Sequence, residues 1–385
     1  MNHKIFALTV VLICLCAAPP RASAQVYGIT DLGTLGGDAS AAQGINSLGQ
    51  VVGWSNTTSG GAHRAFFFSD GTMTDLGTLV GGTTSEAAAV NDAGQVIGVS
   101  GINAYGPGFR EVMQGFIWQG GTMRSLGALY CYCSFNTRYG TSAAYAVNNG
   151  AQIVGQSEAT AHGSWAPHAT LWQPGAMQDI SGAVGADWYW SISHAFGIND
   201  LGQVVGDFAQ DAVLLQVVTY DRRAFLWQSG TRQDLGTLPG YSSSTALAIN
   251  KNGQVVGWSG AADASSAHAF VWDAGAMQDL GTLPGDPNSQ ALGINGLGQV
   301  VGWSGTDRAS ARAFLWWNGV MLDLNLLLPI GSGWVLTQAA GINDRGQIAG
   351  TGLHDGQVRA FLLNPKITIG VPEIPVTAPF AATIK

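Results

Sequence analysis

The chain has 385 residues, a formal net charge of −8 and only 10% charged residues. This acidic balance argues against nucleic-acid binding, because proteins that bind nucleic acids carry basic patches. Apolar residues make up 46% of the chain and Trp occurs 13 times, which excludes intrinsic disorder. The 55 glycines indicate many tight turns.

The first 24 residues have the features of a secretory signal peptide. Lys4 supplies a positive start, an apolar run covers 5–18, and Ala22-Ser23-Ala24 is a small-residue cleavage site. We therefore expect a secreted protein, extracellular or periplasmic, whose mature chain begins at Gln25. Beyond this segment no apolar run approaches the ~20 residues of a membrane helix, so no membrane span is expected in the mature chain.

Three short phrases then recur in a fixed order. The first is Gly-Ile-Asn-Ser-Leu-Gly-Gln-Val-Val-Gly-Trp at 44–54, and its variants carry a Gln four residues and a Gly seven residues after the Asn. The second contains Ala-Phe, as in Arg-Ala-Phe-Leu-Trp at 223–227, and the third is Asp-Leu-Gly-Thr-Leu, as at 234–238. Seven asparagines mark the first phrase, at intervals of 45 to 57 residues: Asn46, Asn91, Asn148, Asn199, Asn250, Asn295 and Asn343.

Each repeat is expected to form four short strands separated by Gly and Asn turns, which is the size and pattern of a propeller blade. The last repeat, 338–363, lacks the fourth strand, whereas a fourth strand without a repeat of its own stands at 27–35. Pairing of 27–35 with 358–363 would close a ring and leave no long sheet edge exposed.

We therefore predict an all-β fold, a seven-bladed β-propeller of four-stranded blades over 25–364, closed by the N-terminal strand and followed by a tail, 365–385. An open solenoid is the alternative, and it would leave the N-terminal strand unpaired.

The recurring phrases resemble the HAF-repeat family of predicted extracellular bacterial proteins. The resemblance covers about 27–363 and rests on His-Ala-Phe at 268–270, with Gly-Ile-Asn-x-x-Gly-Gln-Val-Val-Gly-type phrases before each Ala-Phe phrase. It implies an extracellular bacterial protein with no established activity, and it implies no catalytic residues.

Residues that every repeat contains are interpreted as structural. The Asn suits a turn in which its side chain hydrogen-bonds nearby backbone, with metal coordination as the alternative. The Gly seven residues later suits close approach of a neighbouring strand or blade. Phe270 and Trp272 exemplify the aromatic residues expected to fill the core between blades. The basic residue before Ala-Phe is expected to hydrogen-bond a neighbouring blade.

Five long insertions distinguish three consecutive repeats: 100–113, 130–142, 157–167, 182–193 and 207–222. In a propeller they would emerge on one face, and their aromatic residues exceed what the core needs. We interpret these residues as platforms for sugar rings or for apolar anchors of a protein partner. Packing of the loops against each other is the alternative. The candidate ligand-binding residues are Tyr105, Tyr132, Trp165, Trp188, Tyr189 and Trp190.

Cys131 and Cys133 lie in the same region. A disulfide between them is tight but feasible in an oxidising compartment. A metal site would require more ligands than His162 or His168 supplies, so no metal or other cofactor is expected.

These observations favour a monomeric, non-enzymatic binding or scaffold module that recognises carbohydrate or an extracellular protein through aromatic loops. The alternative is a hydrolase or lyase acting on polysaccharide, which requires a pair of carboxylates or a comparable acid and base. Glu111 and Glu158 are the candidate pair, because they lie on adjacent predicted loops. No nucleophile motif, phosphate loop or zinc signature supports this alternative.

Overall fold

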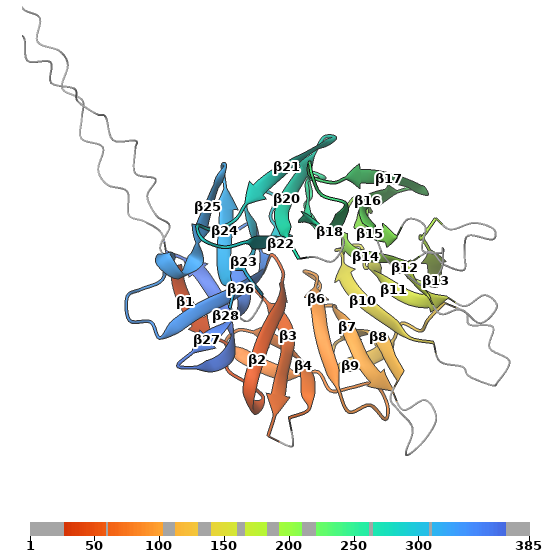
Figure 1. Ribbon diagram of the computed structural model, residues 1–385. Helices are drawn as coiled ribbons and strands as arrows, with labels where there is room; N and C mark the ends of the chain where they lie inside the picture. The colour runs from red at the N-terminus through yellow and green to blue at the C-terminus, as the bar shows by residue number, and fades with distance from the viewer. Residues whose placement is uncertain are drawn as a thin grey trace, which may run out of the picture.

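The computed structural model describes residues 27–58, 61–102, 112–129, 140–159, 166–182, 192–209, 221–261, 265–307 and 310–366. Within these residues, strands β1 to β28 form seven antiparallel four-stranded sheets around a central axis (Figure 1). The predicted all-β, seven-bladed propeller is therefore confirmed. Among the described residues, no helix is long and apolar enough to cross a membrane.

Blades 1 to 4 follow one another along the chain. Blade 1 contains β2 (Gly36–Ile45), β3 (Val51–Thr57), β4 (His63–Ser69) and β5 (Thr72–Asp75). Blade 2 contains β6 (Ser85–Val90), β7 (Val96–Ile102), β8 (Val112–Gln119) and β9 (Thr122–Ser125). Blade 3 contains β10 (Ser142–Val147), β11 (Ile153–Ala159), β12 (Ala166–Gln173) and β13 (Ala176–Asp179). Blade 4 contains β14 (Ser193–Ile198), β15 (Val204–Ala209), β16 (Arg222–Gln228) and β17 (Thr231–Gly236).

Blades 5 to 7 complete the ring. Blade 5 contains β18 (Ser243–Ile249), β19 (Val255–Gly260), β20 (Ala267–Asp273) and β21 (Ala276–Gly281). Blade 6 contains β22 (Asn288–Ile294), β23 (Val300–Gly305), β24 (Arg312–Trp317) and β25 (Val320–Asp323), followed by the 3-10 helix η2 (Leu324–Leu327). Blade 7 contains β26 (Trp334–Ile342), β27 (Ile348–His354), β28 (Gln357–Pro365) and β1 (Tyr27–Asp31).

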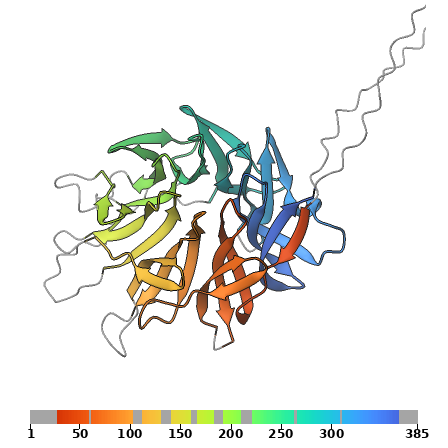
Figure 2. The same cartoon turned by 180° about the vertical axis from the view of Figure 1, so that it is seen from behind.

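The first strand of every blade lies at the axis, and the fourth lies at the rim (Figures 1 and 2). Because neighbouring strands are antiparallel, turns between the first and second strands lie at one end of the axis. We call this end the turn face. Loops between the second and third strands, and the connections between blades, lie at the other end, which we call the loop face. The described ends of all five predicted insertions therefore lie at the loop face.

The repeated Gly of the second strand permits a close strand approach. A Cβ atom on Gly257 would lie 1.9 Å from the backbone oxygen of Thr245 on β18. This contact lies beside a bulge, where the pairing of β18 with β19 shifts between Ala246 and Ala248. The equivalent glycine of every blade would meet an oxygen of its first strand at 1.8 to 2.1 Å. The predicted close approach is confirmed.

The core lies between blades, where the aromatic residues of the third strands pack. Phe270 is 0% exposed and Trp272 is 7% exposed, in one cluster with Val205 and Ala224 of blade 4. The prediction that these two side chains fill the core between blades is confirmed. Blade 3 differs, because the buried Thr170 occupies the Phe position.

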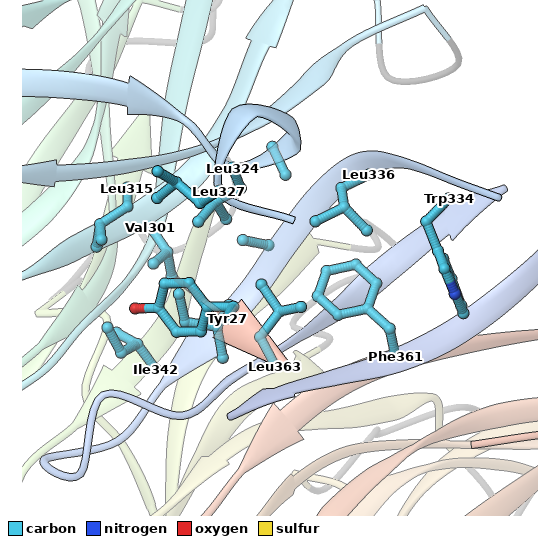
Figure 3. Close-up of a cluster of buried hydrophobic side chains, with 13 residues drawn as sticks. Tyr27, Val301, Leu315, Leu324, Leu327, Trp334, Leu336, Ile342, Phe361 and Leu363 are labelled. Carbon is cyan, nitrogen blue, oxygen red and sulfur yellow. The ribbon is translucent and has the colours of Figure 1, made fainter. Parts of the chain in front are cut away.

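The N-terminal strand β1 completes blade 7. It pairs with β28 from Tyr27 opposite Pro365 to Asp31 opposite Phe361, so its partner segment is 361–365, two residues beyond the predicted end at 363. The strand also ends at Asp31 and not at 35, because the Asp31 carboxylate accepts the N–H of Gly33 in a turn. Tyr27 is 0% exposed and packs beside Leu363 and Leu315, which links blade 7 to blade 6 (Figure 3).

Candidate functional site

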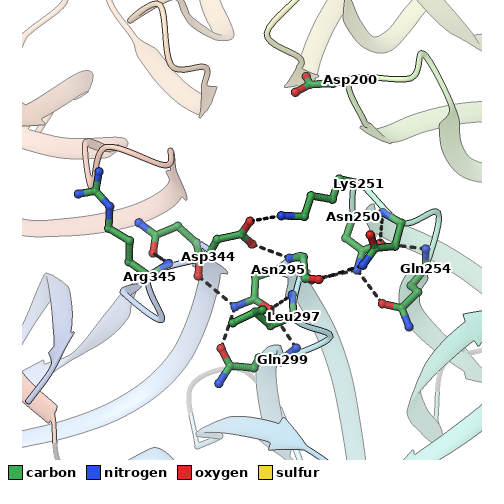
Figure 4. A network of polar contacts seen from close by, with 12 residues as sticks. Asp200, Asn250, Lys251, Gln254, Asn295, Leu297, Gln299, Asp344 and Arg345 are labelled. Atoms are coloured by element: carbon green, nitrogen blue, oxygen red, sulfur yellow. Dashed lines mark hydrogen bonds and ion pairs between the residues drawn. The ribbon is translucent and has the colours of Figure 1, made fainter. Parts of the chain in front are cut away.

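The seven repeated asparagines form a hydrogen-bonded ring at the turn face. In blade 5, Asn250 Oδ1 accepts the N–H groups of Asn252 and Gln254, both at 3.0 Å. Its Nδ2 donates to Gln254 Oε1 at 2.8 Å and to the backbone oxygen of Asn295 in blade 6 at 2.9 Å (Figure 4). The predicted turn role is confirmed, whereas the bond to the next blade was not predicted.

The same bond to the next blade occurs around the whole ring. Each Asn donates to the backbone oxygen of the following Asn at 2.9 to 3.0 Å, and Asn343 donates to Asn46. Both hydrogens of each side-chain amide are used, and Oδ1 accepts the N–H of the Gln in every blade. The ring is therefore a structural device that offers no free group to a ligand.

An axial cavity of about 250 Å³ lies at this face and is lined by all seven blades. Because the asparagine amides are already fully hydrogen-bonded, the residues that follow them in the sequence supply the polar and charged groups that differ between blades in the cavity lining. Lys251 donates from Nζ to Asp344 Oδ2 at 2.6 Å, and this hydrogen bond lowers the pKa of Asp344 below its ordinary value (Figure 4). Gly296 lies between them, and a Cβ there would be 2.3 Å from Lys251 Cε.

The basic residue before Ala-Phe pairs mainly within its own blade. His268 Nδ1 lies 2.9 Å from Asp279 Oδ2 on the adjacent fourth strand, β21. In blade 2 both members differ, because Ser125 Oγ donates to Gln114 Oε1 at 2.6 Å. The predicted bond to a neighbouring blade was therefore wrong for His268, since the fourth strand of the same sheet lies nearer. Gln114 also donates from Nε2 to the backbone oxygen of Gly140, just before the first strand of blade 3, at 3.2 Å. Arg359 is an exception and donates to the Asp38 oxygen of blade 1.

The six predicted ligand-binding residues lie outside the described residues, as do Cys131, Cys133 and Glu111. They are Tyr105, Tyr132, Trp165, Trp188, Tyr189 and Trp190. Glu158 is described, and its Oε2 accepts the N–H of Thr141 at 3.3 Å. Within the described ranges, no group of three His, Cys, Asp or Glu side chains is arranged to hold a metal ion.

A buried charged cluster in blade 4 was missed by the sequence analysis. Asp207 is 1% exposed, and its Oδ1 lies 2.6 Å from His194 Nδ1. Its Oδ2 accepts hydrogen bonds from Arg222 Nη1 and Thr245 Oγ1, both at 3.0 Å. Burial raises the pKa of Asp207, but the hydrogen bonds and charges of His194 and Arg222 together outweigh burial, so the net pKa is below the ordinary value. Asp207 is therefore an ionised carboxylate whose charge Arg222 balances.

Two aromatic rings continue from this cluster along the first strands of blades 3 and 4. Phe196 lies 5.6 Å from the ring of His194, and Tyr145 lies 5.3 Å from Phe196, measured between ring centroids. Both side chains are half-buried. Neither ring belongs to the hydrophobic clusters found among the described residues on either side of blade 3. They are thus additional to the repeated core.

Blade 4 also lacks a hydrogen bond that, in most other blades, joins a serine of the second strand to the segment leading into the blade from the preceding one. In blade 5, Ser259 Oγ accepts the N–H of Leu238 at 3.0 Å, and the equivalent serine makes the same hydrogen bond in blades 1, 2, 3 and 6. Blade 4 has Phe208 in this position, with the Arg232 guanidinium 4.0 Å above its ring. Arg232 also donates to the backbone oxygen of Ser181. The position that supplies a serine hydroxyl in those five blades therefore offers no hydroxyl in blade 4.

A departure from the repeat is the sequence signal for this cluster. The residue after the repeated Gly is Trp54, Trp258 or Trp303 in three blades, whereas blade 4 has Asp207. A charged residue in a position that carries an indole ring in three other blades identifies a specialised blade.

The fold defines this protein as a seven-bladed β-propeller. No protein-family model matches the chain, and no curated protein matches it. A gluconolactonase from Xanthomonas campestris is 12% identical, with 91% of this chain and 94% of that chain covered and a TM-score of 0.40. The β-propeller domain of the Trilobed protease from Pyrococcus furiosus is 10% identical, with 74% and 81% covered and a TM-score of 0.46. Similarities this distant say nothing about activity.

Proposed function

We propose that the protein is a non-enzymatic binding module of the extracellular or periplasmic space. The propeller is the scaffold, and the loop face of blades 2 to 4 contacts the ligand. One observation carries this proposal. The polar residues common to all blades are used in structural bonds, whereas aromatic and charged residues additional to the repeat gather on the described strands of blades 3 and 4.

The positions of Tyr145 and Phe196 in the sequence also support a binding site at the loop face. Tyr145 and Phe196 lie on β10 and β14, and these strands directly follow the connections 130–139 and 183–191. Those connections contain Tyr132, Trp188, Tyr189 and Trp190. Aromatic side chains with polar neighbours are typical of recognition surfaces, because each ring offers a large apolar area at a low entropic cost.

A double substitution on the loop face tests the proposal. We expect Trp188→Ala/Trp190→Ala to weaken binding at least tenfold on arrays of oligosaccharides and of bacterial surface proteins, with an unchanged Tm. Trp317→Ala is the matched control, because Trp317 is a 47% exposed tryptophan of blade 6. The control should bind as the wild type does. Early unfolding of the double variant, or unchanged binding, would show that these tryptophans do not form a recognition surface.

A further inference from the structure

We infer that the inner end of this binding site is a sugar subsite formed by Tyr145, Phe196 and His194, and that it takes an uncharged pyranose ring. The inference rests on the proposed function, because the subsite would extend the loop-face site inward along the first strands of blades 3 and 4. It adds the chemical class of the ligand and three described residues that contact it.

The backbone gives Tyr145 and Phe196 a distinct orientation. Each occupies a one-residue bulge, between Ala144 and Ala146 in β10 and between Ala195 and Gly197 in β14. A bulge re-aims its side chain relative to the regular strand. The five other blades carry no aromatic residue at this bulge, where the residues are Gln43, Ala88, Leu247, Leu292 and Ala340. The two rings are therefore specific to adjacent blades and not required by the bulge.

The polar end of the aromatic row is held in a fixed orientation. His194 Nδ1 faces the Asp207 carboxylate at 2.6 Å, and Arg222 and Thr245 hold that carboxylate from its other oxygen. The imidazole orientation is thereby fixed, and Nε2 points away from Asp207 as a hydrogen-bonding group. The contacts that the structure gives for the His194 ring are this bond and the stacked ring of Phe196.

Tyr145 supplies the complementary donor. Burial, with a smaller contribution from the Asp207 charge, raises the pKa of Tyr145 to about 12. The phenol therefore keeps its proton at neutral pH and can donate it. A sugar hydroxyl both donates and accepts, so it matches a phenol donor and an imidazole acceptor along one aromatic row.

The charge balance selects an uncharged ligand. Arg222 pairs with Asp207 at 3.0 Å, so each of these two charges already has its counter-ion within the cluster. A uronate or sulfated sugar would lose hydration without gaining a counter-ion there. An uncharged pyranose instead places its C–H face on an aromatic ring and its hydroxyls on the few polar groups, as in ligand sites generally.

The decisive variant replaces the two aromatic residues by leucine, the residue found at the same bulge in blades 5 and 6. We expect Tyr145→Leu/Phe196→Leu, which reproduces the leucines at 247 and 292, to weaken binding of neutral oligosaccharides at least tenfold. The probes are hexamers of glucose, mannose, galactose and N-acetylglucosamine, with a galacturonate hexamer for comparison, measured by calorimetry. Leu247→Ala/Leu292→Ala is the matched control at the same bulges and should bind as the wild type does.

The outcomes separate this inference from the proposed function. If Trp188→Ala/Trp190→Ala abolishes hexamer binding but Tyr145→Leu/Phe196→Leu does not, the loop face binds and the inner subsite is wrong. Binding of only the galacturonate hexamer, or of a surface protein but no saccharide, would overturn the ligand class. If neither double variant changes binding, the loop-face proposal fails as well.

A second measurement uses the unmodified protein, in case the leucine variant does not fold. We expect the imidazole signals of His194, assigned from His194→Gln, to shift when a bound neutral hexamer reaches saturation. The signals of His63 in blade 1 are the internal reference and should not move. Binding of a hexamer without any shift at His194 would exclude the subsite.

Discussion

Asn343 donates a hydrogen bond from Nδ2 to the backbone oxygen of Asn46 at 3.0 Å, although 297 residues separate them. This bond joins the last repeat to the first and makes the asparagine ring continuous. Because every member also binds its own turn, each side chain couples local turn geometry to the contact between blades.

Because of these hydrogen bonds, we expect substitution of a ring asparagine to lower the free energy of unfolding more than substitution of most other polar residues. Asn250→Ala leaves the N–H groups of Asn252 and Gln254 without their acceptor. It also removes one of the two hydrogen bonds that the oxygen of Asn295 accepts, the other coming from Gly298. We expect a loss of about 3 kcal/mol in the free energy of unfolding, measured by urea denaturation. Asn149→Ala, at an exposed neighbour of the ring, is the control and should cost about 0.5 kcal/mol. Equal costs for the two variants would contradict a structural ring.

Tyr27 allows the contribution of the closing strand to be measured. Its ring is fully buried, so Tyr27→Ala should cost about 3–5 kcal/mol by opening a cavity between blades 6 and 7. Its hydroxyl is buried without a hydrogen-bond partner among the described residues. Tyr27→Phe should therefore stabilise the protein by about 1 kcal/mol. A destabilised Tyr27→Phe variant would show that the hydroxyl is bonded.

The repeated aromatic core should be equally sensitive. Phe270→Ala and Trp272→Ala should each cost about 3–5 kcal/mol, because both side chains are buried between blades 4 and 5. Thermal unfolding of the purified variants measures this loss. Phe270→Leu retains most of the volume and serves as the control, with a cost of less than half as much. A loss below about 1 kcal/mol for Phe270→Ala would reverse the core assignment.

The Asp207 cluster predicts a pH-dependent part of the stability. The pKa of Asp207 is lower in the folded protein than in the unfolded chain, where it is about 3.9. Its stabilisation is therefore present above about pH 4 and lost as pH falls through the folded value. Asp207→Asn should cost about 3 kcal/mol at pH 7, because it leaves Arg222 without its counter-ion.

Urea denaturation at pH 7, 5 and 3 measures this difference. The wild type should lose more stability than Asp207→Asn between pH 5 and pH 3. Asp279→Asn is the control, because Asp279 forms the equivalent kind of pair with His268 at an exposed position. The expectation fails if Asp207→Asn and Asp279→Asn show the same pH dependence.

The fold could be predicted well from the sequence because the recurring phrases mark where each blade begins and ends. The displaced third phrase at 31–35 predicts blade 7, although the pairing extends from 27 to 31 against 361–365. The bond from each Asn to the next blade could not be predicted, because the phrase specifies a turn and not the distance to its neighbour. For a related reason, the sequence analysis placed the partner of His268 in a neighbouring blade, whereas His268 pairs with Asp279 of its own blade. The register between strands of one blade is set by the folded sheet and cannot be deduced from the phrases.

The candidate site is only partly predictable. Its location on blades 2 to 4 follows from the insertions, but Asp207 and His194 were missed because they lie within ordinary strands. Their signal is a departure from the repeat, which emerges only when the blades are compared position by position. The assignment of ligand binding to Trp188, Trp190 and their aromatic neighbours remains a prediction.

The place of β1 in blade 7 also sets an order of events during synthesis. Blades 1 to 6 are each built from consecutive residues, so their sheets can pair as soon as those residues leave the ribosome. Among the described strands, β1 emerges first and finds its partner last, because residues 361–365 are made some 330 residues later. Residues 27–31 therefore remain without their partner strand until 361–365 have been made, and until then blade 7 cannot close the ring.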